Sequence, residues 1–350
     1  MSQSPDRYRE ITASGPPRQL GREIGEALQE EIRGFCSVAL DRVNKTASVT
    51  LEASQSVAAQ SLDDARNYNP ALIEELEGVA ETSRVALLDL MLLQVRNQLT
   101  AESESGCTAL SLRPCLVAQN WDNDPALDEF TVVLTRRPEG RPSLTTITQA
   151  GLIAYIGFND AGIGACLNTL PAPCRTRGVP HYFTLRDLYE QRSLDDAAHS
   201  IRRAKRAIAA NIILSTPQGP ADLEVTIDNV HVLTDEVNDR VTHTNHCLHP
   251  ALTTINEHFD ELIQSYPRKL RIDSLLDQTE APIGVEHIKQ ALRDHDGHPR
   301  SICRHPNDDP QTGFWSTVFS VIIEPAARRM HVSRGTPCDR PYEIYSMDAA

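Results

Sequence analysis

A glycine followed by a cysteine in the middle of the chain is the residue pair best suited to chemistry. Gly106 and Cys107 lie where helical sequence gives way to strand-rich sequence. Cleavage of the bond between them would leave Cys107 with a thiol and a free α-amino group, a nucleophile and its base in one residue. An α-amino pKa of about 7.7–8.0 lies close to a thiol pKa of about 8.5, so proton transfer between the two groups costs little near neutral pH. The pair therefore suggests a peptide bond that the protein breaks itself.

Glycine at this position also has a steric use. It reaches backbone conformations that would push the carbonyl of Gly106 toward the thiol. Residues 118–122 add an amide, an indole and a carboxylate where the next strand would return. The alternative is that Cys107 is a small buried hydrophobe, as many mid-chain cysteines are.

Hydrophobic periodicity divides the chain into a helical first part and a strand-rich remainder. Helices are expected over 19–43, from Asn69-Pro70 onward, and over 87–99, 194–208, 252–277 and 285–293. Alternating or β-branched runs predict strands at 116–120, 130–135, 144–149, 211–215, 223–227, 230–234, 241–245, 315–323 and 329–334. Two more strands are expected within 151–170, joined by a turn at 159–162. This order fits one α+β domain in which sheets pack together with helices outside.

Charge and hydropathy limit the classes of partner. The 350 residues carry 34 Lys and Arg against 48 Asp and Glu, a net charge of −14. Nucleic acids and anionic membrane surfaces need a basic face, so both are disfavoured as partners. No run of 18 apolar residues and no apolar leader segment is present. The sequence therefore predicts a soluble protein of the cytoplasm or another intracellular compartment.

The eight cysteines show no CxxC spacing. Together with the lack of a leader segment, this predicts reduced thiols and disfavours both a disulfide framework and a thiol redox protein. His243, His246 and Cys247 form one short cluster without a partner cluster, which argues against a zinc site. Neither GxGxxG nor a P-loop occurs, so neither a metal nor a cofactor is expected.

Several short motifs occur along the chain in a characteristic order. They are Gly106-Cys107-Thr108, Gln119-Asn120-Trp121-Asp122, Gly157-Phe158-Asn159-Asp160-Ala161-Gly162, Gly178-Val179-Pro180, His243-Thr244-Asn245-His246-Cys247-Leu248 and Ser301-Ile302-Cys303-Arg304, preceded by a glycine-rich segment at 15–25. With these motifs the chain resembles the acyl-coenzyme A:isopenicillin N acyltransferase-like family of N-terminal-nucleophile cysteine hydrolases. The matches extend from about residue 10 to 335. They are specific for the family and not for a substrate.

The resemblance implies a four-layer αββα sandwich and self-cleavage between Gly106 and Cys107. A mostly helical α segment, 1–106, and a β segment, 107–350, would stay associated as one globular domain. Cys107 matches the family's nucleophile, and Asp122 matches the carboxylate beside it, which assists maturation and contacts the amino group or substrate. Asn245 matches the amide of the oxyanion hole, and Arg304 matches an arginine that holds a substrate carboxylate. The resemblance gives His243 and His246 supporting positions with no proton to move.

One departure concerns the substrate. The penicillin-forming enzymes follow their Trp-Asp pair with two aromatic residues that line the pocket, whereas this chain has Asn123 and Asp124. We therefore expect Asn123 and Asp124 to contact the substrate, with a missing aromatic floor and a preference for polar or cationic groups. Trp121 itself is expected to serve packing.

The expected activity is hydrolysis of a small N-acyl or peptide-like amide through a Cys107 thioester. Acyl transfer from an acyl-coenzyme A donor, as in penicillin formation, is the first alternative. The second is an unprocessed, non-catalytic relative that binds a ligand. Arg304 as a structural ion-pair partner, Asn245 as a turn residue and Asp122 as a cap or turn residue are the corresponding structural alternatives.

Overall fold

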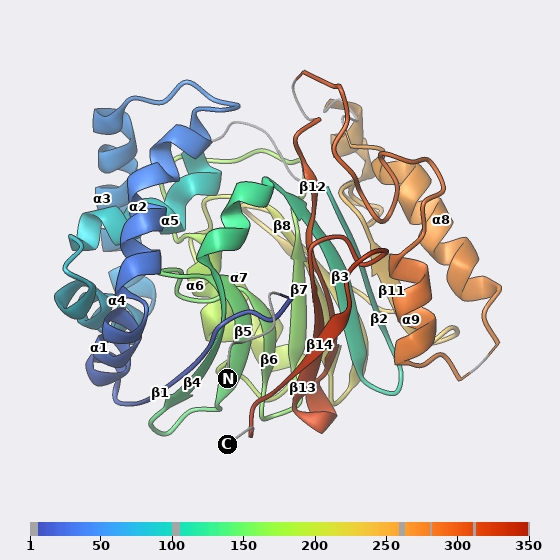
Figure 1. The fold of residues 1–350 in the computed structure, drawn as a ribbon, viewed down its shortest axis with the longest axis horizontal. Helices are drawn as coiled ribbons and strands as arrows, with labels where there is room; N and C mark the ends of the chain where they lie inside the picture. The colour runs from blue at the N-terminus through green and yellow to red at the C-terminus, as the bar shows by residue number, and fades with distance from the viewer. Residues whose placement is uncertain (1–5, 100–105, 259–262, 281, 311–312, 349–350) are drawn as a thin grey trace.

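The protein forms four layers, with two β-sheets stacked face to face between two layers of helices (Figure 1). The structure is a computed structural model that describes residues 6–99, 106–258, 263–280, 282–310 and 313–348. Residues 100–105, which lead to the expected cleavage site, lie outside the described residues. The layer order confirms the expected αββα sandwich.

The larger sheet has eight strands in the described residues, all antiparallel except for the parallel pair β1 and β4. In spatial order they are β1 (Glu10–Gly15), β4 (Thr131–Pro138), β5 (Leu144–Gln149), β6 (Ile156–Asn159), β7 (Gly164–Asn168), β8 (Ala210–Thr216), β9 (Gly219–Val225) and β10 (Val230–Leu233). The turn expected at 159–162 joins β6 to β7, and Gly162 adopts a positive φ of 89° there.

The smaller sheet carries the chemistry-bearing motifs. Its order is β11 (Arg240–His243), β2 (Cys107–Leu112), β3 (Leu116–Asn123), β12 (Ser316–Glu324), β13 (Arg329–Arg334) and β14 (Tyr342–Ser346), every pair antiparallel. Because β2 and β3 lie in the middle of this sheet, Cys107 begins a strand that has paired neighbours on both sides.

The helices form the two outer layers. On the larger sheet lie α1 (Pro17–Ala27), α2 (Gln29–Val43), α3 (Leu51–Tyr68), α4 (Pro70–Ser83), α5 (Leu87–Leu99), α6 (His181–Leu188) and α7 (Leu194–Arg202); α8 (Ser265–Asp277) and α9 (Val285–Leu292) cover the smaller sheet. Short 3-10 turns span Pro125–Phe130, Thr253–His258 and Pro325–Ala327. No helix in the described ranges is long and apolar enough to cross a membrane.

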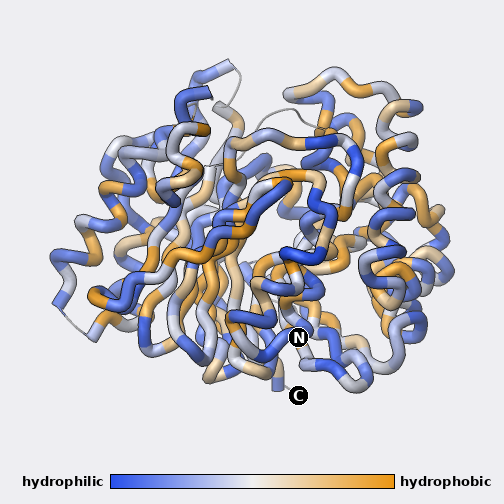
Figure 2. Tube along the Cα trace, turned by 180° about the vertical axis from the view of Figure 1, so that it is seen from behind, coloured by the Kyte–Doolittle hydropathy of each residue, from blue (hydrophilic) through white to orange (hydrophobic). Residues whose placement is uncertain are grey.

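Two hydrophobic clusters hold the layers together. The larger cluster joins residues on both sides of Gly106, including Leu20 and Leu93 from the helices and Phe319 from the smaller sheet. The second joins that sheet to α8 and α9, through residues such as Leu110 and Ile272. Accordingly, the central strands are mostly apolar, whereas apolar and polar stretches alternate along the helices (Figure 2). Both faces of β2 and β8 are buried, as is usual for strands covered on two sides.

Two of the predicted helices are shorter than expected. The 252–277 segment is helical as α8 only from Ser265, and a 3-10 turn precedes it. The 194–208 helix ends at Arg202, where the buried guanidinium of Arg206 donates to the carbonyls of Ile201 and Arg202. These bonds satisfy helix-terminal carbonyls that would otherwise lack partners, and they end the helix early.

Candidate active site

Cys107 is the first residue of β2 and is 1% exposed. Its backbone N–H donates to Oδ1 of Asn245 at 2.9 Å. The carbonyl of Gly106 accepts from the backbone N–H of Asp122 at 3.1 Å. Both polar atoms of the Gly106–Cys107 peptide bond are therefore held by residues that the sequence analysis singled out.

Asp122 lies near the end of β3, completely buried. Its Oδ1 accepts from the Thr317 hydroxyl at 2.7 Å, and its Oδ2 lies 3.5 Å from Nε of Arg304. Burial raises the pKa of Asp122 to about 6, although the charges of Arg304 and Arg268 act in the opposite direction. Asp122 is thus a carboxyl group that can exchange a proton near neutral pH.

Arg304 is also completely buried and donates from Nη2 to the carbonyl of Ile263 at 2.8 Å. Among the described residues, its Nε and Nη1 have no hydrogen-bond partner. Burial lowers the pKa of Arg304, and the charge of Asp122 opposes that effect. Arg304 therefore forms an ion pair with Asp122, and among the described residues its Nε and Nη1 make no hydrogen bond.

Asn245 follows β11 and is held through both ends of its amide. Oδ1 accepts from Cys107 and from Nη2 of Arg268 at 2.8 Å, whereas Nδ2 donates to the carbonyl and hydroxyl of Thr169 at 3.1 and 3.0 Å. Its backbone N–H donates to Oγ of Ser265 at 2.8 Å. The donors on one side and the acceptors on the other fix the orientation of the amide.

Arg268 is a site residue that the sequence analysis missed. It comes from the first turn of α8 and is 2% exposed. Its Nη1 donates to the carbonyl of Cys107 at 2.6 Å and to the hydroxyl of Thr108 at 2.9 Å, while Nη2 reaches Asn245. In sequence it is one of two arginines in the predicted 252–277 helix, and nothing local separates it from Arg271.

Two guanidinium groups border Gly106. A Cβ atom at Gly106 would lie 3.5 Å from Nη2 of Arg268 and 3.5 Å from Nε of Arg304. The residue before the expected cleavage site is thus surrounded by positive charge. A carboxylate formed at Gly106 by cleavage would meet both guanidinium groups.

The Cys107 thiol is protonated in this arrangement. Burial, followed by the negative charge of Asp122, raises the pKa of the Cys107 thiol to about 12. The backbone amide of Asp122 and the charge of Arg268 lower it in part. Attack by Cys107 therefore requires a base that takes the proton during the reaction.

A cavity lies beside these residues, and two residues that contact Cys107 or Asn245 also line it. Trp121 pairs with Cys107 across the β2–β3 ladder, Thr169 binds Asn245, and both line the cavity. Its apolar wall comprises Trp121, Leu127, Tyr155, Leu167, Leu170, Tyr182, Ile208, Phe314 and Trp315. The expected loss of an aromatic floor is therefore wrong, because aromatic side chains from other strands and loops line the cavity.

Asn123 and Asp124 line the cavity as expected, but Asp124 is not an unpaired charge. Its Oδ2 binds Arg42 and Lys45, and its Oδ1 accepts from the backbone N–H of Ala126. Burial raises the pKa of Asp124, but the Lys45 bond and other contacts outweigh it, so the pKa is lowered overall. With Arg96, the cavity holds three cations against one carboxylate. These charges do not favour the cationic substrate group that was expected beside Asp124.

His243 and His246 support their neighbours in different ways. Nε2 of His243 lies 3.0 Å from Oε1 of Glu224, which also accepts from the backbone of Leu248. Nδ1 of His246 lies 2.7 Å from Oγ of Ser265, the same hydroxyl that receives the Asn245 backbone N–H. Neither imidazole contacts Cys107 by a hydrogen bond in the described structure, and the expectation that these histidines move no proton stays a prediction.

The chain is similar to known proteins along most of its length. A family model described as acyl-coenzyme A:6-aminopenicillanic acid acyl-transferase matches residues 111–339. The chain is 27% identical over 352 residues to the 40 kDa form of acyl-coenzyme A:6-aminopenicillanic-acid-acyltransferase from Emericella nidulans, across 96% of this chain and 95% of the relative.

Solved structures show weaker likeness. A variant of conjugated bile acid hydrolase from Clostridium perfringens has a TM-score of 0.45 and 9% identity, covering 69% of this chain and 96% of that one. Penicillin V acylase from Agrobacterium tumefaciens has a TM-score of 0.39 and 10% identity, covering 67% and 76%. The family model, in contrast, spans more than half of the chain. The chain belongs to the acyl-coenzyme A:6-aminopenicillanic acid acyl-transferase family.

Proposed function

We propose that the protein cleaves itself between Gly106 and Cys107 and then transfers acyl groups from amides through a thioester on Cys107, with water as the acceptor. The observation that carries the proposal is that both polar atoms of the Gly106–Cys107 peptide bond are hydrogen-bonded. Its carbonyl accepts from the Asp122 amide, and its N–H donates to Asn245. These contacts support polarisation of the carbonyl and orientation of the leaving nitrogen.

Self-cleavage would proceed as an acyl shift from nitrogen to sulfur. The Cys107 sulfur attacks the Gly106 carbonyl carbon, the thiol proton passes to the Asp122 carboxylate, and the C–N bond breaks as the Cys107 nitrogen gains a proton. Water then hydrolyses the thioester and leaves a carboxylate on Gly106. A pKa of about 6 suits Asp122 to both accept and return the proton.

In the cut enzyme, the new α-amino group of Cys107 would take over as base. The thiolate attacks the substrate carbonyl, the amine leaves with a proton, and water releases the acyl group as an acid. We assign the oxyanion contact to Nδ2 of Asn245, which now donates to Thr169 at the cavity wall. An incoming carbonyl would share or replace that partner.

The substrate class follows from the cavity and its surroundings. Aromatic and aliphatic side chains suit an apolar acyl group, and three cations suit an anionic group on the substrate. Departure of Gly106 would also leave space beside Nε of Arg304, which has no hydrogen-bond partner among the described residues, and this supports the assignment of Arg304 to a carboxylate. The proposed substrate is therefore an N-acyl amide with an apolar acyl half and a carboxylate.

The two segments should stay together after cleavage. Arg42, Lys45 and Arg96 come from the segment before Gly106, whereas Trp121 and Tyr155 come from the segment after it. β1 also pairs with β4 across the cut, and one hydrophobic cluster contains both segments. Separation would open the cavity and expose that core, which burial opposes.

A denaturing gel and intact-mass measurement test self-cleavage. Wild-type protein should give fragments of 1–106 and 107–350, the larger beginning Cys-Thr-Ala-Leu. Cys107→Ala should stay whole, whereas Cys166→Ala, which removes another buried thiol from β7, should be cut. A cut at the same bond in protease-free Cys107→Ala protein, or a whole wild-type chain without amidase activity, would overturn the proposal. The latter result would favour the non-catalytic ligand-binding alternative.

Acyl transfer to an amine is the second candidate, because the relative from Emericella nidulans is named an acyl-coenzyme A acyltransferase. The corrected aromatic lining also removes the reason for doubting a penicillin-type acyl pocket. Hydrolysis and transfer share the thioester and differ in the acceptor. Incubation of the cut enzyme with an aryl-acetyl coenzyme A and 6-aminopenicillanic acid separates them: amide formation above the rate of thioester hydrolysis supports transfer.

A further inference from the structure

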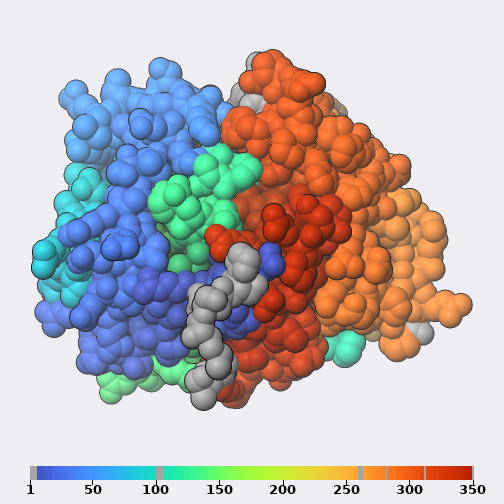
Figure 3. Space-filling model, viewed as in Figure 1, coloured from blue at the N-terminus to red at the C-terminus, as the bar shows by residue number. Residues whose placement is uncertain are grey.

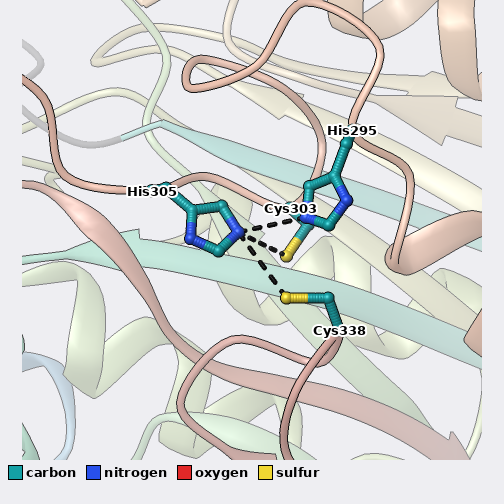
Figure 4. A group of neighbouring side chains, drawn as sticks. All are labelled: His295, Cys303, His305 and Cys338. Atoms are coloured by element: carbon teal, nitrogen blue, oxygen red, sulfur yellow. Dashed lines mark hydrogen bonds between the residues drawn. The ribbon is translucent and has the colours of Figure 1, made fainter.

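Four potential metal ligands from separate parts of the chain converge on the outer side of the smaller sheet. His295, Cys303 and His305 lie between α9 and β12, and Cys338 lies between β13 and β14. Figure 4 shows their side chains pointing toward one another. One potential ligand atom from each lies within 4.8 Å of all the others.

We propose that these four residues form a structural site for a thiophilic divalent cation, with zinc as its natural occupant. Two sulfur and two imidazole ligands are a common set for structural zinc, which binds four ligands tetrahedrally. The site lies apart from the cavity, because none of the four residues lines it.

The distances between potential ligand atoms fit such a centre. With Zn–S near 2.3 Å and Zn–N near 2.0–2.1 Å, a tetrahedron places N and S atoms about 3.5 Å apart and two N atoms about 3.3 Å apart. Nε2 of His305 lies 3.6 Å from Sγ of Cys303, 3.6 Å from Sγ of Cys338 and 3.1 Å from Nε2 of His295. Only small movements would be needed to enclose the ion.

The backbone around the cluster is already fixed. The N–H of Cys303 donates to the carbonyl of Asp294 at 3.0 Å, and Nε of Arg293 donates to the carbonyl of Pro337 at 2.8 Å. Nδ2 of Asn120, on β3, binds the carbonyls of Leu292 and Ile302 at 2.8 and 2.9 Å. These bonds hold three chain segments together before any ion binds, so little ordering would be required.

Burial also suits a structural ion. Cys303 is buried, His305 and Cys338 are half-buried, and His295 is exposed. The set is thus reachable from solvent on one side and enclosed on the other. Binding would release one proton from each thiol and would leave a neutral centre, since two thiolates balance the charge of the ion.

The proposed ion has a consequence for the active site. Cys303 and His305 flank Arg304, whose guanidinium lies beside Asp122. Ligation of both neighbours would fix the backbone on either side of Arg304. This part of the inference rests on the proposed function, whereas the metal site itself does not.

Metal content tests the site directly. Full-length wild-type protein, purified without chelators or a metal-affinity tag, should contain about one zinc per chain by elemental analysis. Cys338→Ser and His295→Gln should lose most of the zinc. Cys36→Ser removes another half-buried thiol, and His298→Gln removes an exposed histidine near the cluster; both should keep it. Cobalt replacement should give a tetrahedral visible spectrum with a thiolate charge-transfer band that Cys338→Ser lacks.

The same measurement on Cys107→Ala keeps this test independent of self-cleavage and turnover. Circular dichroism shows whether each variant is folded. His295→Gln changes an exposed residue, so it still tests the site if Cys338→Ser does not fold. Absence of zinc from wild-type protein grown with added zinc overturns the proposal. So does equal zinc in Cys338→Ser, or a mass about 2 Da lower from a Cys303–Cys338 disulfide.

Discussion

Replacement of Arg268 by lysine separates the role of this arginine from a general need for positive charge. The guanidinium binds three acceptors at and around Cys107, namely the carbonyl of Cys107, the hydroxyl of Thr108 and Oδ1 of Asn245. Lysine keeps the charge but has a single nitrogen, which cannot span Cys107 and Asn245 together. The contact to Asn245 is the one we expect to be lost.

The expected decrease in kcat follows from the loss of that one hydrogen bond. A hydrogen bond from a charged donor contributes about 1.5–3 kcal/mol, and each 1.36 kcal/mol of barrier is tenfold in rate. If Asn245 must be held in place as the oxyanion forms, kcat should fall by about 10- to 150-fold. KM should change little, because Arg268 does not line the cavity.

The assay measures kcat and KM of the cut enzyme on one N-acyl amide, with urea unfolding of the same samples. Arg271→Lys is the matched control, because it changes the same side chain on the same helix, where Arg271 binds the more distant Asp294. The control should keep kcat within about twofold. A raised KM with unchanged kcat in Arg268→Lys, or equal losses in both variants, would refute the reasoning. A loss of stability alone would make Arg268 a structural residue.

Four further predictions concern the same site. Asn245→Ala should lower kcat by about 10²–10³ with little change in KM, and a change in KM alone would remove Asn245 from the oxyanion hole. Arg304→Met should reduce kcat/KM about 10- to 100-fold for carboxylate-bearing amides and far less for neutral ones; equal losses would indicate only an ion pair with Asp122. The folded state holds the Asp122 proton more tightly than the unfolded chain, so the contribution of Asp122 to stability should be fully present below pH 4 and be lost as pH rises through about 6. The free energy of unfolding should fall by about 3 kcal/mol, from roughly two pKa units at 1.36 kcal/mol each. Urea titrations of the Cys107→Ala precursor measure this pH dependence. Asp122→Asn should weaken the pH dependence, and an unchanged pH dependence would contradict the raised pKa of Asp122. Arg42→Met should weaken binding of anionic substrates. The increase in KM relative to wild type should be larger for a carboxylate-bearing amide than for its neutral methyl ester analogue, and an equal increase for both would exclude a charge contact.

The sequence predicted the elements whose signal is local. Leu87–Leu99 and Leu144–Gln149 have the expected bounds, because periodic apolar residues on a helix and alternating ones on a strand reflect burial directly. The helix Leu51–Tyr68 was missed because its buried face is made of small and polar residues such as Ser54, Ala58 and Ser61. The edge strands β1 and β14 were missed because most of their residues are not buried.

The linear order of motifs also named Cys107, Asp122 and Asn245, which the fold brings into one hydrogen-bonded group. Their catalytic roles stay predictions, to be tested by the variants above. Cys107 begins β2, Asp122 lies near the end of β3 and Asn245 follows β11, so neighbouring strands of one sheet bring the three residues together. Sequence could not supply Arg268, since one helical arginine resembles another until the packing of α8 buries it beside Cys107.

Only the tertiary structure decided the surroundings of that group. Asp124 looked like an available charge until folding placed Arg42 and Lys45 against it, some eighty residues away in the chain. The aromatic wall and the His295–Cys338 cluster are likewise assembled from distant segments. In the space-filling view, the surfaces of the first hundred residues and of the C-terminal part meet on one face of the molecule (Figure 3). The sequence by itself placed the helices and strands whose apolar pattern is local, and it singled out the Gly106–Cys107 pair. Charge pairing and cavity shape depend on contacts that exist only after the layers pack.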